Sequence, residues 1–496
     1  MGLINGGRWM AASTRWTAVL LLGPAVLAGC GAGGPRTART GASGHTTNRT
    51  GTAGAPAPGS LAAGTTSSTS SVPGQVGSKP AGSASAPTTA ASATPSSNQS
   101  TPKPKVDPSA LTGTSLAFVS AGGLWEVAGG REVEVAAPTG LVAVHPTFSA
   151  DGRWLAFLEV PTGTSSAVPE LWMSRSDGAG AHQVTSVTDP EYLAWSPSGE
   201  RLLVATAGAN GPAQVLVVQP TGAVSQLGSG LVASAAWSPA GTEVAVSLTN
   251  HEATGFTSVI ESVPASGGGL PTVWRTNTQD VLEVAGWWSS WGIVYWDDPD
   301  GSASIAADGL ELDALAGAAQ APHAIADTLV RSDWLSTGPV PEVALVQGDS
   351  RLEWEGKSVA MCAPFSCRTV PTARGSVSLD PCLSVQGTLA YVQGPSSQSP
   401  DSSPTQVAAW EAGHTLWTES SRSRTVTELA GGRGASAPMW SADGRRLMFV
   451  RQDGLWVMPS SGGTGVQVVQ GVSVPASYYG QVQWLDQFAW APAPAP

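Results

Sequence analysis

The chain has 496 residues, of which only 12% are charged, while Gly (60), Pro (38) and Trp (20) are abundant. This composition is typical of many short strands joined by turns and differs from that of long, charged amphipathic helices. A net charge of -12 argues against a nucleic-acid-binding surface, because neutralising phosphates requires clustered Lys and Arg and the 24 present are spread along the chain.

Residues 1–29 form a predicted lipoprotein signal peptide. Arg8 and Arg15 supply positive charge, and an apolar run from Trp16 to Val26 follows that is too short to span a bilayer stably. A charged start followed by a short apolar run is typical of a segment that directs export and is then removed. We therefore expect the mature protein to lie outside the cytoplasm.

The four residues after the apolar run resemble the lipobox of bacterial lipoproteins: Leu27, Ala28, Gly29 and Cys30. The small Ala28 and Gly29 fit a narrow protease site, and the thiol of Cys30 is the nucleophile that accepts diacylglycerol. The resemblance implies that Cys30 becomes the lipidated N-terminus, anchored to the extracytoplasmic face of the membrane, where two acyl chains hold more stably than one. An ordinary secretory signal that ends in Cys is the alternative.

Residues 30–107 form a predicted disordered tether that begins with the lipidated Cys30. From Gly31 onward the segment consists almost entirely of Gly, Ala, Ser, Thr and Pro. Such a segment cannot bury enough apolar surface to offset the entropy of ordering it. As a flexible coil it would reach about 50 Å on average. A stalk through the cell wall or periplasm and a neutral spacer are both open interpretations.

A repeat dominates the chain from Leu111 onward. Its clearest copies are Phe148-Ser-Ala-Asp-Gly152, Trp195-Ser-Pro-Ser-Gly199, Trp237-Ser-Pro-Ala-Gly241 and Trp440-Ser-Ala-Asp-Gly444. Weaker copies begin at Trp288, Trp334 and Leu383, and an eighth at Trp484 lacks the glycine. Successive copies are 42 to 57 residues apart, which is the length of a four-stranded propeller blade with variable loops.

The repeat has a physical explanation. The aromatic residue ends one strand and packs between neighbouring sheets, and the residues after it form a tight turn in which Gly adopts positive φ without steric cost. Apolar runs such as Trp154-Leu-Ala-Phe157 and Leu447-Met-Phe-Val450 follow the turns, with the composition of buried strands. We therefore expect most Trp side chains of the repeat to form the core between sheets.

The segment His145-Pro-Thr-Phe-Ser-Ala-Asp-Gly-Arg-Trp-Leu-Ala-Phe157 resembles the WD40-like (PD40) repeat of TolB-type propellers, and residues 193–203 repeat it closely. The resemblance implies an all-β fold, with a single β-propeller of four-stranded blades over residues 108–491 and a disordered tail at 492–496. Together with the lipobox, the chain resembles the LpqB-type lipoproteins, whose propellers are associated with envelope signalling.

The ends of the repeat region indicate how the ring closes. The first folded segment contains the second, third and fourth strands of a blade, at 116–119, 124–127 and 132–135. Residues 481–484 are interpreted as the missing first strand, and joining the two ends removes exposed sheet edges. We count eight blades. Seven is the alternative, because Trp334 and Leu383 anchor weak copies and Phe488-Ala-Trp490 leaves a further strand unassigned.

Three cysteines lie in the propeller. Cys362 and Cys367 are separated by four residues in a strand-rich stretch, so a disulfide between the two arms of a hairpin is predicted, with two free thiols as the alternative. A metal site is not predicted there, because the pair has no second ligand pair nearby. Cys382 is expected to be a buried small apolar residue.

No catalytic residue, metal site or cofactor is assigned. No Gly-x-Ser-x-Gly elbow lies between a strand and a helix, and no His-Glu-x-x-His zinc motif occurs. Asp297-Asp-Pro-Asp-Gly301 lacks the later ligands of an EF-hand and is interpreted as a hairpin turn. Carboxylates and histidines from different blades can still meet across the central funnel.

Two classes of function stay open. The favoured one is a lipid-anchored binding scaffold in the cell envelope, with the membrane and an envelope protein, peptide or glycan as partners and no nucleic acid. The alternative is a propeller-fold enzyme that acts on envelope polysaccharide or peptide, with its site in the central funnel. Trp287, Trp288 and Trp291 form the one aromatic cluster that we consider for carbohydrate stacking, with core packing as the competing interpretation.

Overall fold

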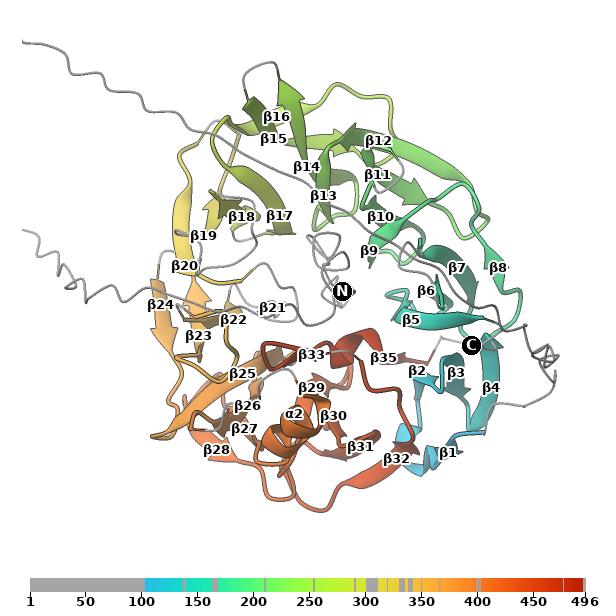
Figure 1. Ribbon diagram of the computed structural model, residues 1–496, viewed down its shortest axis with the longest axis vertical. Helices are drawn as coiled ribbons and strands as arrows, with labels where there is room; N and C mark the ends of the chain where they lie inside the picture. The colour runs from blue at the N-terminus through green and yellow to red at the C-terminus, as the bar shows by residue number, and fades with distance from the viewer. Residues whose placement is uncertain are drawn as a thin grey trace, which may run out of the picture. The chain divides into compact units, whose positions relative to one another are not determined.

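The computed structural model describes residues 103–136, 140–162, 168–208, 211–252, 255–289, 291–299, 311–318, 320–329, 335–337, 342–348, 350–364, 366–397, 400, 403–475 and 477–493. These residues form an eight-bladed β-propeller, as predicted, in which each blade is an antiparallel sheet of four or five strands. The blades surround a central axis with the first strand of each blade towards the centre (Figure 1).

The blades are numbered around the ring, and their strands are given from the centre outwards. Blade 1 contains β35 (Phe488–Pro492), β2 (Thr114–Ser120), β3 (Gly123–Ala128) and β4 (Arg131–Ala136). Blade 2 contains β5 (Leu141–Phe148), β6 (Trp154–Pro161), β7 (Glu170–Arg175) and β8 (His182–Gln183). Blade 3 contains β9 (Pro190–Trp195), β10 (Leu202–Thr206), β11 (Ala213–Val218) and β12 (Val224–Gly230). Blade 4 contains β13 (Val232–Trp237), β14 (Glu243–Glu252), β15 (Gly255–Pro264) and β16 (Thr272–Asn277).

The remaining four blades follow the same order. Blade 5 contains β17 (Val281–Trp288), β18 (Gly292–Asp298), β19 (Glu311–Leu315) and β20 (His323–Asp327). Blade 6 contains β21 (Leu335–Thr337), β22 (Val343–Gln347), β23 (Ser358–Ala363) and β24 (Ser366–Thr369). Blade 7 contains β25 (Ser376–Leu383), β26 (Leu389–Pro395), β27 (Thr415–Glu419) and β28 (Val426–Glu428). Blade 8 contains β29 (Ser436–Trp440), β30 (Arg446–Arg451), β31 (Gly454–Pro459) and β32 (Val466–Gln470), with β1 (Lys105–Val106) as a fifth strand.

The ring closes in blade 1, where the C-terminal strand β35 pairs with β2. The three strands predicted at the start of the folded region are β2, β3 and β4, but the predicted first strand at 481–484 is wrong. Gln481 and Val482 form β34, which pairs only with β33 (Ser477–Tyr478), and Trp484 begins the 3-10 helix η3 (Trp484–Asp486). The segment 488–490, which the sequence analysis left unassigned, belongs to the closing strand β35. The aromatic anchor of blade 1 is therefore Trp490, and the glycine-free copy at Trp484 is not an anchor.

A second contact crosses the same seam. Strand β1 pairs with the outer strand of blade 8, Lys105 opposite Gln470 and Val106 opposite Val469. The short helix η1 (Pro108–Leu111) then leads into blade 1 and buries Leu111 among the side chains between blades 8 and 1. Residues 105–107, which the sequence analysis assigned to the tether, are therefore part of the propeller.

The turns of the repeat are built as expected from the sequence. In the copy at Ser441, the serine hydroxyl accepts from the Arg446 N–H at 3.0 Å, and the Gly444 N–H donates to the Ser441 carbonyl at 2.8 Å. Gly444 has φ +67. The turns at Ser149, Ser196 and Ser238 repeat this arrangement. A hydroxyl at the first turn position and a glycine at the fourth thus fix the reversal between the first two strands of a blade.

The aromatic residue before each such serine joins neighbouring blades. Three of these Trp side chains donate from Nε1 to the carbonyl one residue before the anchor of the preceding blade: Trp195 to Thr147 (3.1 Å), Trp237 to Ala194 (2.9 Å) and Trp440 to Cys382 (3.0 Å). Apolar side chains fill the spaces between blades, with clusters between blades 8 and 1, 1 and 2, and 2 and 3, and a continuous one from blade 3 to blade 8. The Trp thus supplies both apolar contact and a directional bond.

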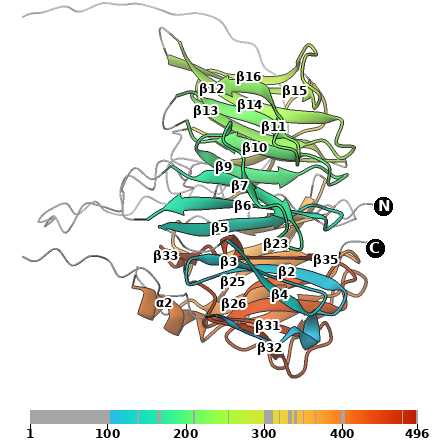
Figure 2. The ribbon, with the colours of Figure 1, turned by 90° about the vertical axis from the view of Figure 1, so that its right-hand side faces the viewer.

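One α-helix interrupts the described part of blade 7, α2 (Pro404–Glu411), between β26 and β27. Its Trp410 is 2% exposed, and Trp410 Nε1 donates to the Pro395 carbonyl at 2.8 Å, so the helix is fixed to β26. Figure 2 shows α2 and β33 on the same face of the ring. None of the helices within the described ranges has the length and apolar character needed to cross a membrane.

Candidate functional site: the centre of the α2 face

The segment between β32 and β35 lies on the α2 face and contacts several blades. We call residues 471–487 the bridging segment; residue 476 lies outside the described ranges. It joins blade 1 through two backbone bonds, from the Ser473 N–H to the Val119 carbonyl (2.9 Å) and from the Val119 N–H to the Gln487 carbonyl (2.8 Å). Figure 1 shows it in dark red along the inner ends of blades 7 and 8.

The hairpin of the bridging segment, β33 and β34, reaches blade 6. The Glu353 N–H donates to the Tyr479 carbonyl at 3.1 Å, and Gln481 Nε2 donates to the Arg351 carbonyl at 3.2 Å. The guanidinium of Arg351 lies 5.7 Å from the centre of the Tyr479 ring. Both blade 6 residues lie in the loop between β22 and β23. The hairpin is therefore held by one backbone bond, one bond from a side chain to a backbone carbonyl, and a cation–π contact.

The 3-10 helix η3 binds blades 7 and 2 at its two ends. Trp484 is 3% exposed, and its Nε1 donates to Glu411 Oε1 at 2.7 Å, where α2 ends. Asp486 Oδ1 lies 3.3 Å from His145 Nδ1 in β5 of blade 2. The bridging segment thus contacts blades 6, 7, 8, 1 and 2, which are the blades on either side of the seam.

The inner strands beneath η3 contain a backbone feature that the sequence analysis did not identify. His145, Asp380 and Ala437 have φ values of 57, 51 and 48, and each precedes a proline. The strand register shifts at each of these positions, so each is a bulge. The sequence signal was an X-Pro pair three residues before the anchor residue. Because proline has no N–H to donate to a neighbouring strand, such a pair favours a bulge over regular pairing.

Two of these bulges and η3 enclose a small pocket. It is lined by residues of β25, β29 and the bridging segment: Asp380, Pro381, Ala437, Pro438, Val482, Trp484 and Leu485. The Asp380 carboxylate accepts from the Ala437 N–H at 2.8 Å and so links the bulge of blade 7 to that of blade 8. The Ala437 N–H lies in a bulge, where the neighbouring strand offers it no carbonyl. The Asp380 carboxylate accepts the hydrogen bond instead.

The polar groups around the pocket are buried or half-buried, and burial is the main cause of their pKa shifts. Burial, with a smaller contribution from the nearby Asp380 carboxylate, raises the pKa of Glu411 to about 7, while hydrogen bonds from Trp484 and Ser436 oppose this rise. Burial lowers the pKa of His414 to about 4, so this imidazole is neutral at pH 7. His414 Nδ1 lies 3.2 Å from Ser436 Oγ. Glu411, Ser436 and His414 therefore form a polar network behind η3, in which Ser436 and His414 are buried and Glu411 is half-buried.

This arrangement can hold or release a proton near neutral pH and can position α2 and η3. Ser436 and His414 are 3% and 2% exposed, so this hydroxyl and imidazole have no open side on which a substrate could bind. Within the ranges that the structure describes, no three His, Cys, Asp or Glu side chains come together in a group suited to a metal ion. The chemistry of the site is therefore that of a polar network that fixes one segment of the chain onto five blades.

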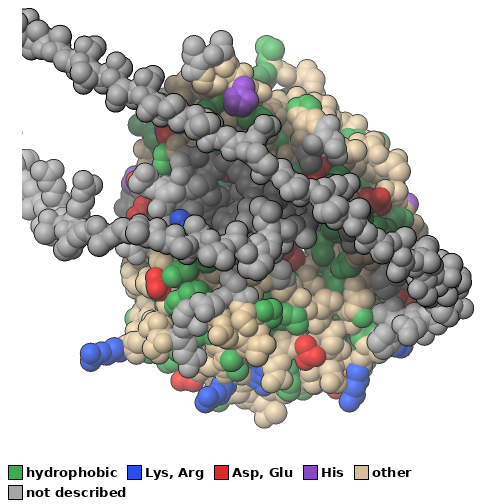
Figure 3. All heavy atoms as spheres, viewed as in Figure 1, with side chains coloured by type: hydrophobic (Ala, Val, Ile, Leu, Met, Phe, Trp, Pro, Cys, Tyr) green, Lys and Arg blue, Asp and Glu red, His purple; other side chains and the backbone are tan. Residues whose placement is uncertain are grey.

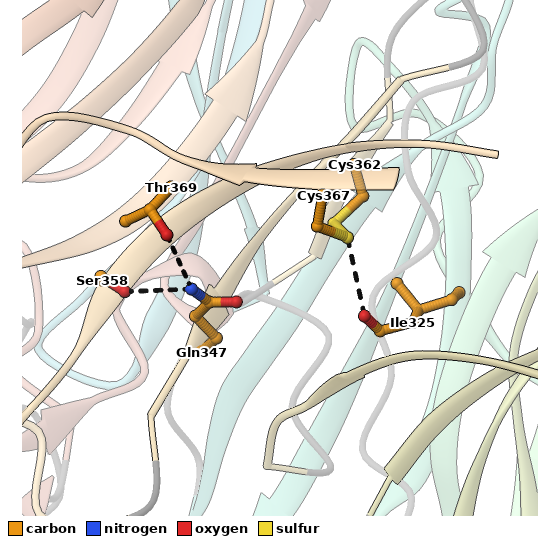
Figure 4. The surroundings of a disulfide bond; sticks show 6 residues. All are labelled: Ile325, Gln347, Ser358, Cys362, Cys367 and Thr369. Carbon is orange, nitrogen blue, oxygen red and sulfur yellow. Dashed lines mark hydrogen bonds between the residues drawn. A yellow bond between two sulfur atoms is a disulfide. The ribbon is translucent and has the colours of Figure 1, made fainter. Parts of the chain in front are cut away.

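The predicted lipidation site lies elsewhere in the chain. Leu27, Ala28, Gly29 and Cys30 are outside the described residues. Cys362 and Cys367 are joined by a disulfide between β23 and β24, at directly opposite positions of the hairpin. Figure 4 shows this bond beside Ile325 of blade 5, whose carbonyl oxygen lies 3.6 Å from the Cys367 sulfur. The disulfide thus lies where blades 5 and 6 meet.

The aromatic cluster is divided between the core and a half-buried position. Trp291 is 5% exposed and belongs to the continuous core. Trp287 and Trp288 are half-buried, and the Trp287 ring meets Trp274 of blade 4 edge-on, with centroids 5.4 Å apart. Cys382 is half-buried rather than fully buried, and its carbonyl accepts the bond from Trp440. None of these residues lies at the pocket beneath η3.

Comparisons with known proteins bear on the fold alone. No family model matches the sequence, and no curated protein matches it. The structure is similar to dipeptidyl peptidase 4 of Porphyromonas gingivalis, with a TM-score of 0.50 and 8% identity over 75% of this chain and 60% of that one. It is also similar to the β-propeller domain of the trilobed protease of Pyrococcus furiosus, with a TM-score of 0.41 and 11% identity over 64% and 94% of the two chains. The neighbours thus include peptidase propeller domains, and at these identities they show the fold alone.

Proposed function

We propose that this chain is an extracytoplasmic lipoprotein whose propeller is a binding scaffold for an envelope protein, peptide or glycan. The anchor in this proposal is Cys30, at the end of the Leu27-Ala28-Gly29-Cys30 sequence. Two acyl chains at this position are sufficient for stable attachment to a bilayer. The resemblance of residues 145–157 to the PD40 repeats of TolB-type propellers supports the same location, and the tether would place the ring at a distance from the membrane.

The contacts of the bridging segment are the main support for a binding role. The segment fixes Trp484 against Glu411 and Asp486 against His145, so these inner groups bind one another. The loops and outer strands of the ring then remain as the surfaces exposed to solvent. The blades beneath them are joined by apolar contacts and Trp hydrogen bonds. A rigid surface of this kind loses little conformational entropy when it binds a partner.

The anchoring half of the proposal is tested by lipid labelling in a bacterial host. Cells that express the full chain are fed an alkyne-bearing fatty acid and fractionated, beside the variants Cys30→Ala and Cys382→Ala. We expect label and membrane association for the wild type and for Cys382→Ala, and the loss of both for Cys30→Ala. A Cys30→Ala variant that keeps label and membrane association would rule out Cys30 as the anchor.

The binding half is tested by affinity capture from cross-linked envelopes with the wild-type chain and Cys30→Ala as baits. We expect one defined envelope component to be captured by the wild type and to be enriched over a bait of equal charge and unrelated fold. Purified component should then bind the full chain with a measurable Kd. The absence of specific capture would contradict the scaffold role and leave turnover of envelope glycans and peptides as the next assay.

A further inference from the structure

The charges of the propeller are unevenly distributed around the ring. Arg275 is the one Lys or Arg between Arg201 and Arg331, a stretch that covers most of blade 3 and all of blades 4 and 5. The same stretch contains Glu243, Glu252, Glu261, Asp280, Glu283, Asp297, Asp298, Asp300, Asp308, Glu311, Asp313 and Asp327. On the face in Figure 3, the coloured Lys and Arg side chains of the described residues lie mostly over blades 7, 8 and 1, and none lies over blade 4. Blades 4 and 5 therefore form an acidic sector.

In the sequence, the twelve Asp and Glu of this stretch are accompanied by one Arg and no Lys. Arg275 Nη2 pairs with Asp297 Oδ2 at 3.1 Å. Even so, burial and the neighbouring Asp280 and Asp313 raise the pKa of Asp297 to about 6. Burial and two nearby carboxylates also raise the pKa of Glu311. Burial is the main cause of both shifts and the neighbouring carboxylates add to it, so a cation placed nearby would favour the ionised forms.

The outer edge of blade 4 adds a second feature to this sector. Strand β16 is the outermost strand of its sheet, and no other described strand pairs with its outer side. Two of the exposed large apolar side chains of the described residues lie here, Leu270 at 93% and Val273 at 51%. The outer strand of blade 1, β4, carries three charges of the kind that protect an edge from further pairing, Arg131, Glu132 and Glu134, whereas the one charge of β16 is Arg275, which pairs with Asp297.

The same chain shows how such an edge is covered. On blade 8, the outer strand β32 pairs with β1, an extended segment that contributes Lys105 and Val106. The added strand supplies backbone hydrogen bonds to the edge, with one basic and one apolar side chain. Lys103, which precedes it, pairs with Glu132 of blade 1 at 3.1 Å. An extended segment with alternating basic and apolar residues is therefore compatible with the outer edge of a blade in this fold.

We propose that the outer edge of β16 binds an extended peptide segment rich in Lys or Arg, which adds to blade 4 as a fifth strand. Its backbone pairs with residues 272–277, its apolar side chains contact Val273 and Leu270, and its basic side chains lie towards the carboxylates of the acidic sector. This inference rests on the proposed binding function and names the chemistry of one partner.

The test measures binding of three synthetic peptides to the full chain by calorimetry. One peptide alternates Lys and Val over eight residues, the second alternates Glu and Val, and the third alternates Lys and Pro. We expect the Lys-Val peptide to bind at least tenfold more tightly than either of the others, because Glu has the wrong charge and Pro cannot form the strand hydrogen bonds. Equal binding of the Lys-Pro peptide would overturn strand addition.

Location is tested with matched variants. Val273→Lys places a like charge on the edge of β16, whereas Val466→Lys changes a 38% exposed valine on β32, the strand that β1 pairs with at Val469 and Gln470. We expect Val273→Lys to weaken binding of the Lys-Val peptide at least tenfold and Val466→Lys to leave it within twofold. Hydrogen exchange should slow in residues 272–277 on addition of the peptide. Unchanged exchange there, or equal losses in the two variants, would overturn the assignment to blade 4.

The two proposals fail in different ways. If the Lys-Val peptide does not bind but the chain still captures an envelope component, the inference about β16 is wrong and the scaffold function stands. If the peptide binds as described but no envelope component is captured, the edge site stands and the envelope scaffold function is contradicted.

Discussion

The guanidinium of Arg446 lies over the indole of Trp490, with its Cζ 5.5 Å from the ring centre, and so joins blade 8 to the strand that closes blade 1. Arg446 also donates to the carbonyls of Ala110 and Thr112, in the chain that leads from β1 into blade 1. One side chain therefore contacts both ends of the folded chain at the seam.

We expect Arg446→Met to weaken this seam. The substitution removes two hydrogen bonds and a cation–π contact, and should lower the free energy of unfolding by about 2–3 kcal/mol. Hydrogen exchange should accelerate in residues 103–112 and 488–492 before it does so elsewhere.

Arg201 offers a matched control, because it lies over Trp237 at 5.2 Å and donates to the Gly241 carbonyl within the continuous part of the ring. Arg201→Met should destabilise by a similar amount without faster exchange at the two chain ends. If both variants released the ends equally, the special role of Arg446 at the seam would be wrong.

The Trp hydrogen bond between blades predicts unequal effects at two anchors. Trp237 Nε1 donates to the Ala194 carbonyl at 2.9 Å, whereas Trp490 Nε1 is buried and has no hydrogen-bond partner among the described residues. Trp237→Phe should lower the free energy of unfolding by about 1–2 kcal/mol more than Trp490→Phe, because it leaves a buried carbonyl unsatisfied. Urea unfolding of both variants measures the difference, and equal losses would contradict a role for the bond.

The glycine of the repeat turn is needed for two separate reasons. Gly199 has φ +75, and a Cβ there would lie 3.0 Å from the Asp151 carboxylate oxygen and 3.2 Å from the Asp151 backbone nitrogen in the adjacent turn. Gly180 has φ +68, and a Cβ added to it would have no atom within 4 Å. Gly180→Ala should cost about 1 kcal/mol through backbone strain alone, and Gly199→Ala roughly 1–3 kcal/mol more through the close approach. Similar melting temperatures for the two variants would exclude the second reason.

The repeat in the sequence was sufficient to predict the fold. A Trp, a Ser and a Gly at fixed spacing specify a strand end and a turn, which are local properties, and their recurrence predicted eight blades, although one of the copies counted, at Trp484, is no anchor. Trp484 shows where this reasoning fails. Its neighbours Leu485 and Asp486 resemble a weak copy of the turn, yet Trp484 binds Glu411 and Asp486 pairs with His145. These partners lie far away in the sequence, and no local pattern identifies them.

The candidate site was invisible for the same reason. Asp380 and Glu411 are ordinary acidic residues in the sequence, and they come together only because a bulge in β25 and the end of α2 meet beneath η3. The X-Pro pairs at 145–146, 380–381 and 437–438 were a usable local signal for the bulges. They could not indicate which segment of the chain would cover them.

Glu126 of β3 gives the last prediction, a pH dependence of stability. The side chain is 1% exposed, and only a hydrogen bond from the Gly178 backbone opposes the effect of this burial on its pKa. Burial and the nearby Asp177 raise the pKa of Glu126 to about 9, so the folded protein keeps this carboxyl protonated at neutral pH. The unfolded chain releases the proton from about pH 4.5 upward. The contribution of Glu126 to stability is therefore fully present below pH 4.5 and is lost as the pH rises towards 9.

Glu126→Gln removes this titration while keeping the size and polarity of the side chain. We expect the variant to be more stable than the wild type at pH 8 by on the order of 3 kcal/mol, and close to it at pH 4.5. Urea unfolding at both pH values measures the change, with Glu428→Gln on the exposed part of β28 as the control. Because the gain comes from the proton that the unfolded chain releases, it must grow between the two pH values. A gain of equal size at pH 4.5 and pH 8 would mean that packing, and not ionisation, distinguishes the two side chains.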